Sequence, residues 1–343
     1  MARFNDVNIK EETNHLIDYI FKCVCKAESS GWGGFRQKGF FNINSRFFTF
    51  VFLCGGNKKE YTSRKLLQGI LSNNKDVKII ISEDLADYKG DMDLLTFEAT
   101  LEAISKMILI PVESYGTACE LGAFTRINKE TNKVVAILDK NRANDKSFIN
   151  YGPISLLNEI DSNRVLHASY RHNKNKHILL KNSDINKLDQ HELIISETKV
   201  NTYFNKETAT VKITDLRSFF VAVLDLICLL GFINIDMILY FFCKRFECDE
   251  FIICTDTINN GEYGLVKDIL FTFLKVLESI GFLKNKSDIY FVQPRKIVSD
   301  YSKDEKWIGQ VLFTNKFTFS DEYVNIKTEA AKIFERLKKY VDF

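Results

Sequence analysis

The sequence predicts an α/β fold with a doubly wound parallel sheet, followed by a C-terminal, mostly helical domain. Apolar runs of strand length alternate with segments of helical periodicity in the first half of the 343-residue chain. Such alternation is typical of parallel sheets built from right-handed βαβ units, with helices on both faces. Beyond about residue 210 the alternation gives way to long apolar helices, which indicate a separate domain.

Each element of the α/β part follows from its own pattern. Short, continuously apolar runs are typical of strands buried on both faces, and they predict strands at Phe47–Leu53, Val77–Ile81, Met107–Val112 and Val134–Leu138. Helical spacing predicts helices over residues 11–28, 61–72, 92–105 and 117–128. We interpret residues 148–166 as a loop and a short helix that end this domain.

The C-terminal part is expected to contain helices at Phe219–Phe232, Ile235–Phe246 and Val266–Ile280, a hairpin within 282–292 and an amphipathic helix over 324–341. Helices followed by a hairpin favour a winged-helix domain, and an all-α interaction domain with one hairpin fits equally well. The predicted organisation is therefore an N-terminal helical extension (1–46), a catalytic domain (47–170), a linker region (171–210) and a helical, winged-helix-like domain (211–343).

Composition excludes several classes of protein. The chain is 45% hydrophobic and 27% charged, with 3 Pro and 16 Gly, which is a globular composition. Its eight cysteines and five histidines do not have zinc-ligand spacing, so no metal site is expected. No apolar stretch reaches the roughly 20 residues of a membrane span, and the N-terminus does not read as a secretory signal. We expect a cytoplasmic protein with no membrane partner.

Glu120 is the main catalytic candidate. It follows the third predicted strand in the run Glu113-Ser-Tyr-Gly-Thr-Ala-Cys-Glu120, close to the sheet edge where ligands of doubly wound folds bind. A carboxylate there can attack or stabilise the anomeric carbon of a ribose. A purely structural interpretation is also open, because Thr117-Ala-Cys-Glu120 fits a capping box with Thr117 as N-cap and Glu120 at N3. The two roles can coexist.

Most of the other candidates lie at the carboxyl ends of the predicted strands, and Glu98 lies on the predicted helix before the third strand. Glycines after the first strand would let backbone N–H groups approach a ribose or phosphate, although glycines in such turns are often structural. Lys58, Lys59 and Arg64 could bind phosphate or lie on a solvated face. The predicted substrate-binding residues are Gly55, Gly56, Asn57, Glu83, Glu98, Glu113, Ser114, Gly116 and Thr117. A capping or solvent-exposed role is the alternative for the acidic residues among them.

These motifs resemble a known family. Phe-Leu-Cys-Gly-Gly at 52–56, Ser-Glu-Asp-Leu at 82–85, Phe-Glu at 97–98, Ile-Pro-Val-Glu-Ser at 110–114 and Glu-Leu-Gly-Ala-Phe at 120–124 resemble the nucleoside 2-deoxyribosyltransferase-like fold. The segments Lys146–Leu157 and Asn163–Leu166 look like the retron anti-phage effectors that carry such a domain. The resemblance covers about residues 47–166.

The resemblance implies an N-glycosidase with Glu120 as the nucleophile at C1′. It implies cleavage of NAD⁺ or a related nucleotide as substrate, with no cofactor, under restraint by a complex of the retron reverse transcriptase and its RNA–DNA product (msDNA). We also expect an oligomer. A nucleotide-sensing, DNA-binding regulator without catalysis and a true nucleoside 2-deoxyribosyltransferase are the two alternatives.

Overall fold

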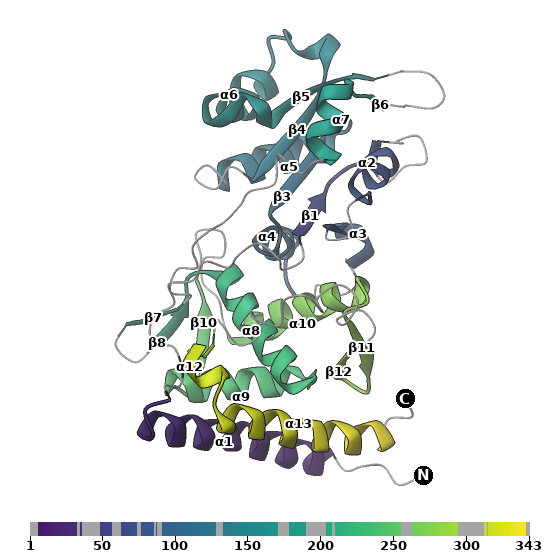
Figure 1. The fold of residues 1–343 in the computed structure, drawn as a ribbon. Coiled ribbons are helices and arrows are strands. Elements are labelled where there is room, and N and C mark those ends of the chain that lie inside the picture. Colours follow the sequence, from purple (N-terminus) through teal and green to yellow (C-terminus); the bar gives the residue numbers. More distant parts are fainter. Residues whose placement is uncertain are drawn as a thin grey trace. The chain divides into compact units, whose positions relative to one another are not determined.

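The computed structural model describes residues 6–32, 35, 49–56, 63–73, 77–85, 87, 91–127, 133–170, 178–189, 204–207, 210–254, 263–293, 312–313 and 315–340. The chain divides into two compact units (Figure 1). The α/β unit comprises Ile43–Asp87 and Leu94–Thr198, and the helical unit comprises Met1–Asn42, Tyr88–Asp93 and Lys199–Phe343. Asn57, Lys58 and Lys59 lie outside the described residues.

The α/β unit is built on one sheet with the strand order β2-β1-β3-β4-β5-β6. The first five strands are parallel, and β6 joins antiparallel to β5. This confirms the predicted α/β fold class. The strands are β1 (Thr49–Leu53), β2 (Val77–Ile80), β3 (Met107–Pro111), β4 (Val134–Asp139), β5 (Val165–Tyr170) and β6 (Ile178–Leu179).

The fifth parallel strand corrects the sequence interpretation of residues 148–166 as a loop and short helix. These residues contain a π-helical turn (Asn150–Ile154), helix α6 (Ser155–Asp161) and the start of β5, so the βα alternation continues for one more unit. The strand sequence Val-Leu-His-Ala-Ser-Tyr is only partly apolar, and the outer half of β5 is only partly buried. A strand of that composition lacks the continuous apolar run that identified the other four.

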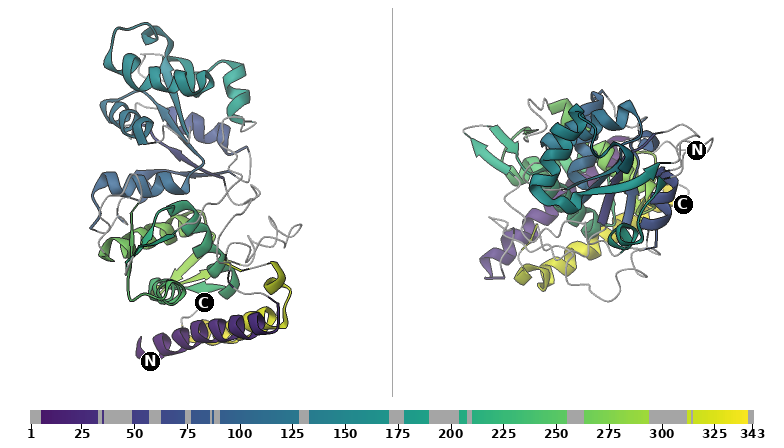
Figure 2. Two further views of the ribbon diagram at one scale, coloured as in Figure 1. Left: turned by 90° about the vertical axis from the view of Figure 1, so that its left-hand side faces the viewer. Right: turned by 90° about the horizontal axis from the view of Figure 1, so that it is seen from above.

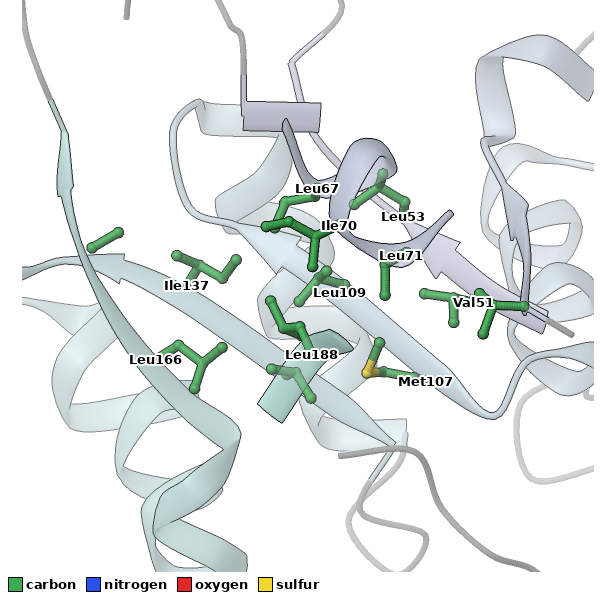
Figure 3. Close-up of a cluster of buried hydrophobic side chains, with 13 residues drawn as sticks. Val51, Leu53, Leu67, Ile70, Leu71, Met107, Leu109, Ile137, Leu166 and Leu188 are labelled. Carbon is green, nitrogen blue, oxygen red and sulfur yellow. The ribbon is translucent and has the colours of Figure 1, made fainter. Parts of the chain in front are cut away.

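Helices cover both faces of this sheet. Between the strands run α2 (Ser63–Leu71), α3 (Ser82–Leu85), α4 (Leu94–Ile104) and α5 (Tyr115–Ile127), with α7 (Asn182–Asp189) after β6. Helices α2 and α7 cover the face that carries Val51 and Leu53 (Figure 3). Phe52 points to the opposite face because strand side chains alternate, and its ring packs edge-to-face against Phe124 of α5 at 5.6 Å.

Helix α7 lies within the segment predicted as a linker, and its packing is that of a core element. Leu188 is 1% exposed and belongs to the same buried cluster as Leu67 and Leu71 of α2 (Figure 3). Ile185 packs against that cluster. Residues 178–189 are therefore part of the α/β unit, while the other predicted domain boundaries stay predictions.

The helical unit combines the N-terminal helix with the C-terminal half of the chain. Figure 2 shows α1 (Asp6–Ser29) lying along α13 (Asp321–Tyr340). Lys26 of α1 pairs with Glu322 of α13 at 3.0 Å. The other helices among the described residues of this unit are α8 (Leu216–Leu230), α9 (Ile235–Phe246), α10 (Tyr263–Ser279) and α12 (Asn315–Thr318). The predicted helices at 219–232, 235–246, 266–280 and 324–341 are thus confirmed within a few residues.

Two small sheets complete this unit. One has the order β10-β8-β7, from Phe204–Glu207 (β7), Thr210–Ile213 (β8) and Phe251–Ile253 (β10). The predicted hairpin is confirmed as β11 (Leu283–Lys286) and β12 (Ile289–Val292), and β9 (Phe232–Ile233) pairs with β12. The winged-helix assignment stays a prediction. Within the described part of the chain, every helix is too short or too polar to cross a bilayer.

The packing of α7 against the core predicts that this helix contributes to the stability of the α/β unit. Leu188→Ala should lower the free energy of unfolding by about 2–4 kcal/mol, because truncating a buried leucine leaves a cavity. Asn186→Ala, at an exposed position of the same helix, should change it by less than about 0.5 kcal/mol. Urea denaturation of both variants checks this, and equal midpoints would mean that α7 is not part of the core.

Candidate functional site

The predicted site residues that the structure describes gather around the point where the chain changes the direction in which it adds strands to the sheet. From β1 the chain passes to β2 on one side, whereas from β3 it passes to β4 on the other. The carboxyl ends of β1 and β3 are neighbours, with Cys54 N–H donating to the Leu109 carbonyl at 3.0 Å. In open α/β sheets, such a topological switch point is where ligands bind.

Glu113 joins the two loops that leave these strands. Its carboxylate accepts a hydrogen bond from the Gly56 N–H at 3.0 Å, and its other oxygen accepts one from the Ser63 hydroxyl at the start of α2. The loop after β3 is thereby fastened to the glycine turn after β1. The structure thus places Glu113, predicted to bind substrate, in contacts that hold the rim of the site together.

The start of α5 differs from the predicted capping box. The helix begins at Tyr115, so Ser114 precedes it and Thr117 lies in its first turn. The Thr117 N–H donates to Ser114 Oγ at 3.2 Å, while Thr117 Oγ1 accepts from the Ser114 N–H at 3.0 Å. This reciprocal arrangement is a capping box between Ser114 and Thr117. The assignment of Thr117 as N-cap with Glu120 at N3 is therefore wrong.

Glu120 lies in the second turn of α5 and is free of any capping duty. Its side chain is half-buried, and its buried Oε2 has no hydrogen-bond partner among the described residues. Burial raises the pKa of Glu120 above its ordinary value, and the charge of Glu83 adds to this. A hydrogen bond from Cys54 and the charge of Arg64 oppose the shift. A buried carboxylate oxygen without a partner is available to a reacting atom.

Glu98 is the second acid of the site. Glu98 belongs to α4 and is only 8% exposed to solvent. Burial raises the pKa of Glu98 to about 7, with the negative charges of Glu120 and Glu83 as further causes. A carboxyl group that keeps its proton near pH 7 beside a second carboxylate is a known way to provide a general acid in a site.

Arg64 is the positive charge of the same cluster. It donates through Nη2 to the Gly55 carbonyl and to Glu83 Oε1, the latter at 2.8 Å. The Arg64 side chain is only 13% exposed, so it does not lie on a solvated face. From the sequence, Arg64 could be named only together with Lys58 and Lys59, as a charge that either binds phosphate or lies on a solvated face. Cys54 was not predicted either, because it reads as a small apolar residue within a strand.

The predicted glycines have different roles. Gly55 has φ of 147°, a conformation that favours glycine, and a Cβ there would lie 3.3 Å from Arg64 Nε and 3.5 Å from Pro111 Cγ. Gly56 supplies the N–H bound by Glu113. Gly116 lies in α5, where a Cβ would make an ordinary 3.7 Å contact with Ser114 Oγ. The fold therefore requires a glycine at 55 and not at 116.

Fold and site together define an α/β protein with a cluster of carboxylates at a topological switch point. Comparison with known proteins assigns the family. Residues 60–284 match the family described as "STM3845 retron effector protein". Because this match covers more than half of the chain, the protein belongs to that retron effector family.

Two relatives from Escherichia coli are similar to part of the chain. The "Retron Ec86 putative ribosyltransferase/DNA-binding protein" is 38% identical over 143 residues, which cover 40% of this chain and 46% of the relative. The corresponding protein of retron Ec73, with the same description, is 34% identical over 120 residues, covering 32% of this chain and 38% of the relative. The match thus spans less than half the length of each relative.

The hydrogen bonds that Glu113 accepts predict a loss of stability when its carboxylate is removed. Glu113→Ala should lower the free energy of unfolding by about 1–3 kcal/mol, because the Gly56 N–H would lose its acceptor. Glu113→Gln should retain most of the stability, since the amide can accept from Gly56 and donate to the Ser63 hydroxyl. Glu159→Ala, at an exposed position of α6, is the control. Thermal and urea denaturation measure all three, and equal losses for Glu113→Ala and Glu159→Ala would contradict the assignment.

Proposed function

We propose that the α/β unit of this retron effector cleaves the N-glycosidic bond of NAD⁺ or a related nucleotide, with Glu120 as nucleophile or stabiliser of the oxocarbenium-like transition state. The observation that supports this most directly is the half-buried Glu120 at the switch point, with an unpartnered carboxylate oxygen and a second carboxyl group beside it. The resemblance to nucleoside deoxyribosyltransferases and the word "ribosyltransferase" in the names of two relatives point to the same chemistry.

The reaction follows from the charges of the site. The ionised Glu120 attacks C1′, so that a C1′–O bond forms while the C1′–N bond breaks and its electron pair leaves with the base. Water then hydrolyses the glycosyl ester, releases a proton and restores the carboxylate. Nicotinamide leaves NAD⁺ as a neutral molecule and needs no proton. An ordinary purine leaves more readily when it is protonated, and in this proposal the protonated Glu98 supplies that proton.

Binding and positioning belong to the loops around Glu120. Gly55, Gly56 and Asn57 follow β1, Glu83 follows β2, and Ser114, Gly116 and Thr117 open α5. Ser114 and Thr117 use their side chains mainly to cap α5, so in this proposal they hold Glu120 in place. The proposed partners are the retron reverse transcriptase and msDNA, which would restrain the activity, and an oligomer of this chain.

Two other functions predict different experimental results from those of a glycosidase. The relatives' names include "DNA-binding protein", and the hairpin beside α10 in the helical unit is compatible with a winged helix. A nucleotide-sensing DNA-binding regulator would bind nucleotide without forming product, and its duplex binding would fall steeply with salt. A 2-deoxyribosyltransferase would turn over only when a free acceptor base is added.

Glu120→Gln tests the catalytic assignment. The variant should keep its fold, since Glu120 takes no part in capping α5, and it should lose at least about 10³-fold in turnover, because the neutral amide cannot attack C1′. The purified chain, alone and with reverse transcriptase and msDNA, is incubated with NAD⁺ and a nucleotide panel, and products are read by mass spectrometry. Glu159→Gln serves as a matched control. Full nicotinamide release by Glu120→Gln would refute the assignment.

Glu98→Gln tests the division of labour between the two acids. In the unsubstituted chain, kcat/KM for a purine nucleotide should rise as Glu120 ionises and fall above about pH 7 as Glu98 loses its proton. The substitution should remove the fall and reduce purine release by about 10²-fold. Nicotinamide release should change by less than about tenfold, because that leaving group needs no acid. Equal losses for both leaving groups would show that Glu98 is not the acid.

A further inference from the structure

The ion pair between Arg64 and Glu83 joins one buried and one exposed side chain. Arg64 is 13% exposed and Glu83 is 39% exposed. Arg64 also donates to the carbonyl of Gly55, a backbone group in the turn that Glu113 fastens through the Gly56 N–H. Glu83 by contrast is held by Arg64 at 2.8 Å and by a long 3.3 Å hydrogen bond from Ser82. Of the two partners of the guanidinium, Glu83 is therefore the exchangeable one.

The guanidinium has more donors than these partners use. Its Nε is buried and has no hydrogen-bond partner among the described residues. A guanidinium presents a fork of N–H groups that matches the oxygens of a phosphate or carboxylate. The side chain of Arg64 thus has more hydrogen-bond donors than its described protein partners use, and an oxyanion could bind to the guanidinium.

Arg64 is also fixed in place at the site. Its Nε and Cβ lie 3.3 and 3.5 Å from the position that a Cβ on Gly55 would occupy, so the side chain crosses the glycine turn. Its charge lowers the pKa of Glu120, which places it within electrostatic reach of that carboxylate. A group held by Arg64 would therefore lie close to the reactive carboxylate.

Two other donors among the described residues of this turn already have an acceptor. The Gly56 N–H and the Ser63 hydroxyl could otherwise hold a phosphate near the start of α2. Both donate instead to the carboxylate of Glu113. Among the described residues of the turn, Arg64 is the cation that an incoming anion can reach by replacing a half-exposed carboxylate.

We propose that Arg64 binds the phosphate of the substrate, and that Glu83 occupies the guanidinium as an internal substitute until the phosphate replaces it. The inference deepens the proposed function and rests on it for the identity of the reaction. It makes the substrate a nucleotide or dinucleotide, since a nucleoside lacks the group that displaces Glu83. Glu83 then competes with the phosphate for Arg64, so displacing it takes up part of the affinity that the phosphate supplies.

Calorimetric binding to the Glu120→Gln chain tests this without turnover. Two matched probe pairs are used, AMP with adenosine and nicotinamide mononucleotide with nicotinamide riboside. In at least one pair, the phosphorylated probe should bind about tenfold or more tightly than its nucleoside. Adding Arg64→Gln should remove this preference, and Arg64→Lys should retain part of it. Adding Glu83→Gln should tighten the phosphorylated probe several-fold and leave the nucleoside unchanged.

Controls separate this inference from a folding defect and from the proposed reaction. Lys65→Gln, at the exposed neighbouring position of α2, should keep the preference for phosphate, and thermal unfolding should show that each variant is folded. If phosphorylated and unphosphorylated probes bind alike, fail to bind, or lose affinity equally in Arg64→Gln, the inference is overturned. If the preference follows Arg64 but no nucleotide is hydrolysed, the inference stands and the proposed function fails.

Discussion

The geometry of the site depends on one partly buried carboxylate. Glu113 fastens the glycine turn after β1 and the start of α2 to the loop that leads into α5. Where the chain leaves two neighbouring parallel strands toward opposite sides of the sheet, a crevice opens at their carboxyl ends. Beyond the strand ends, backbone hydrogen bonds between the strands no longer hold the two loops together. A side chain with two acceptor oxygens closes that gap. The positions of Arg64 on one side and Glu120 on the other follow from this connection.

The electrostatics of the site follow from burial in combination with this geometry. Glu83, Glu98 and Glu120 share one region with a single described arginine, Arg64, so their charges are not fully compensated. The most buried of the three, Glu98, holds its proton to about pH 7 and thereby relieves the repulsion. Burial raises the pKa of Glu120 as well, but the hydrogen bond from Cys54 and the charge of Arg64 act against this rise and favour its ionised form. In the proposed reaction, differences in environment and not in residue type would separate the acid Glu98 from the nucleophile Glu120.

Sequence patterns predicted most of the fold and only the outline of the site. β1 to β4 were found because continuous apolar runs identify buried strands, whereas β5 carries His167 and Ser169 and was missed. Glu120 is singled out by its place after a predicted strand, and Glu98 by its place on the helix before the third strand; their roles stay predictions. The contacts of Glu113 with Gly56 and Ser63 join residues 57 and 50 positions apart. No local pattern encodes such a pairing, nor the pKa that burial confers on Glu98.

The start of α5 shows how structure and chemistry are divided along one helix. A shift of the helix start to Tyr115 moves capping to Ser114 and Thr117 and leaves Glu120 one turn further on. The N-terminal turn of a helix offers unpaired N–H groups that favour a carboxylate and lower its pKa. Because Glu120 lies beyond that turn, it gains little from these groups, and burial dominates instead. Its carboxylate is consequently less stabilised in the resting protein and retains an oxygen for the ribosyl centre that the proposed reaction forms.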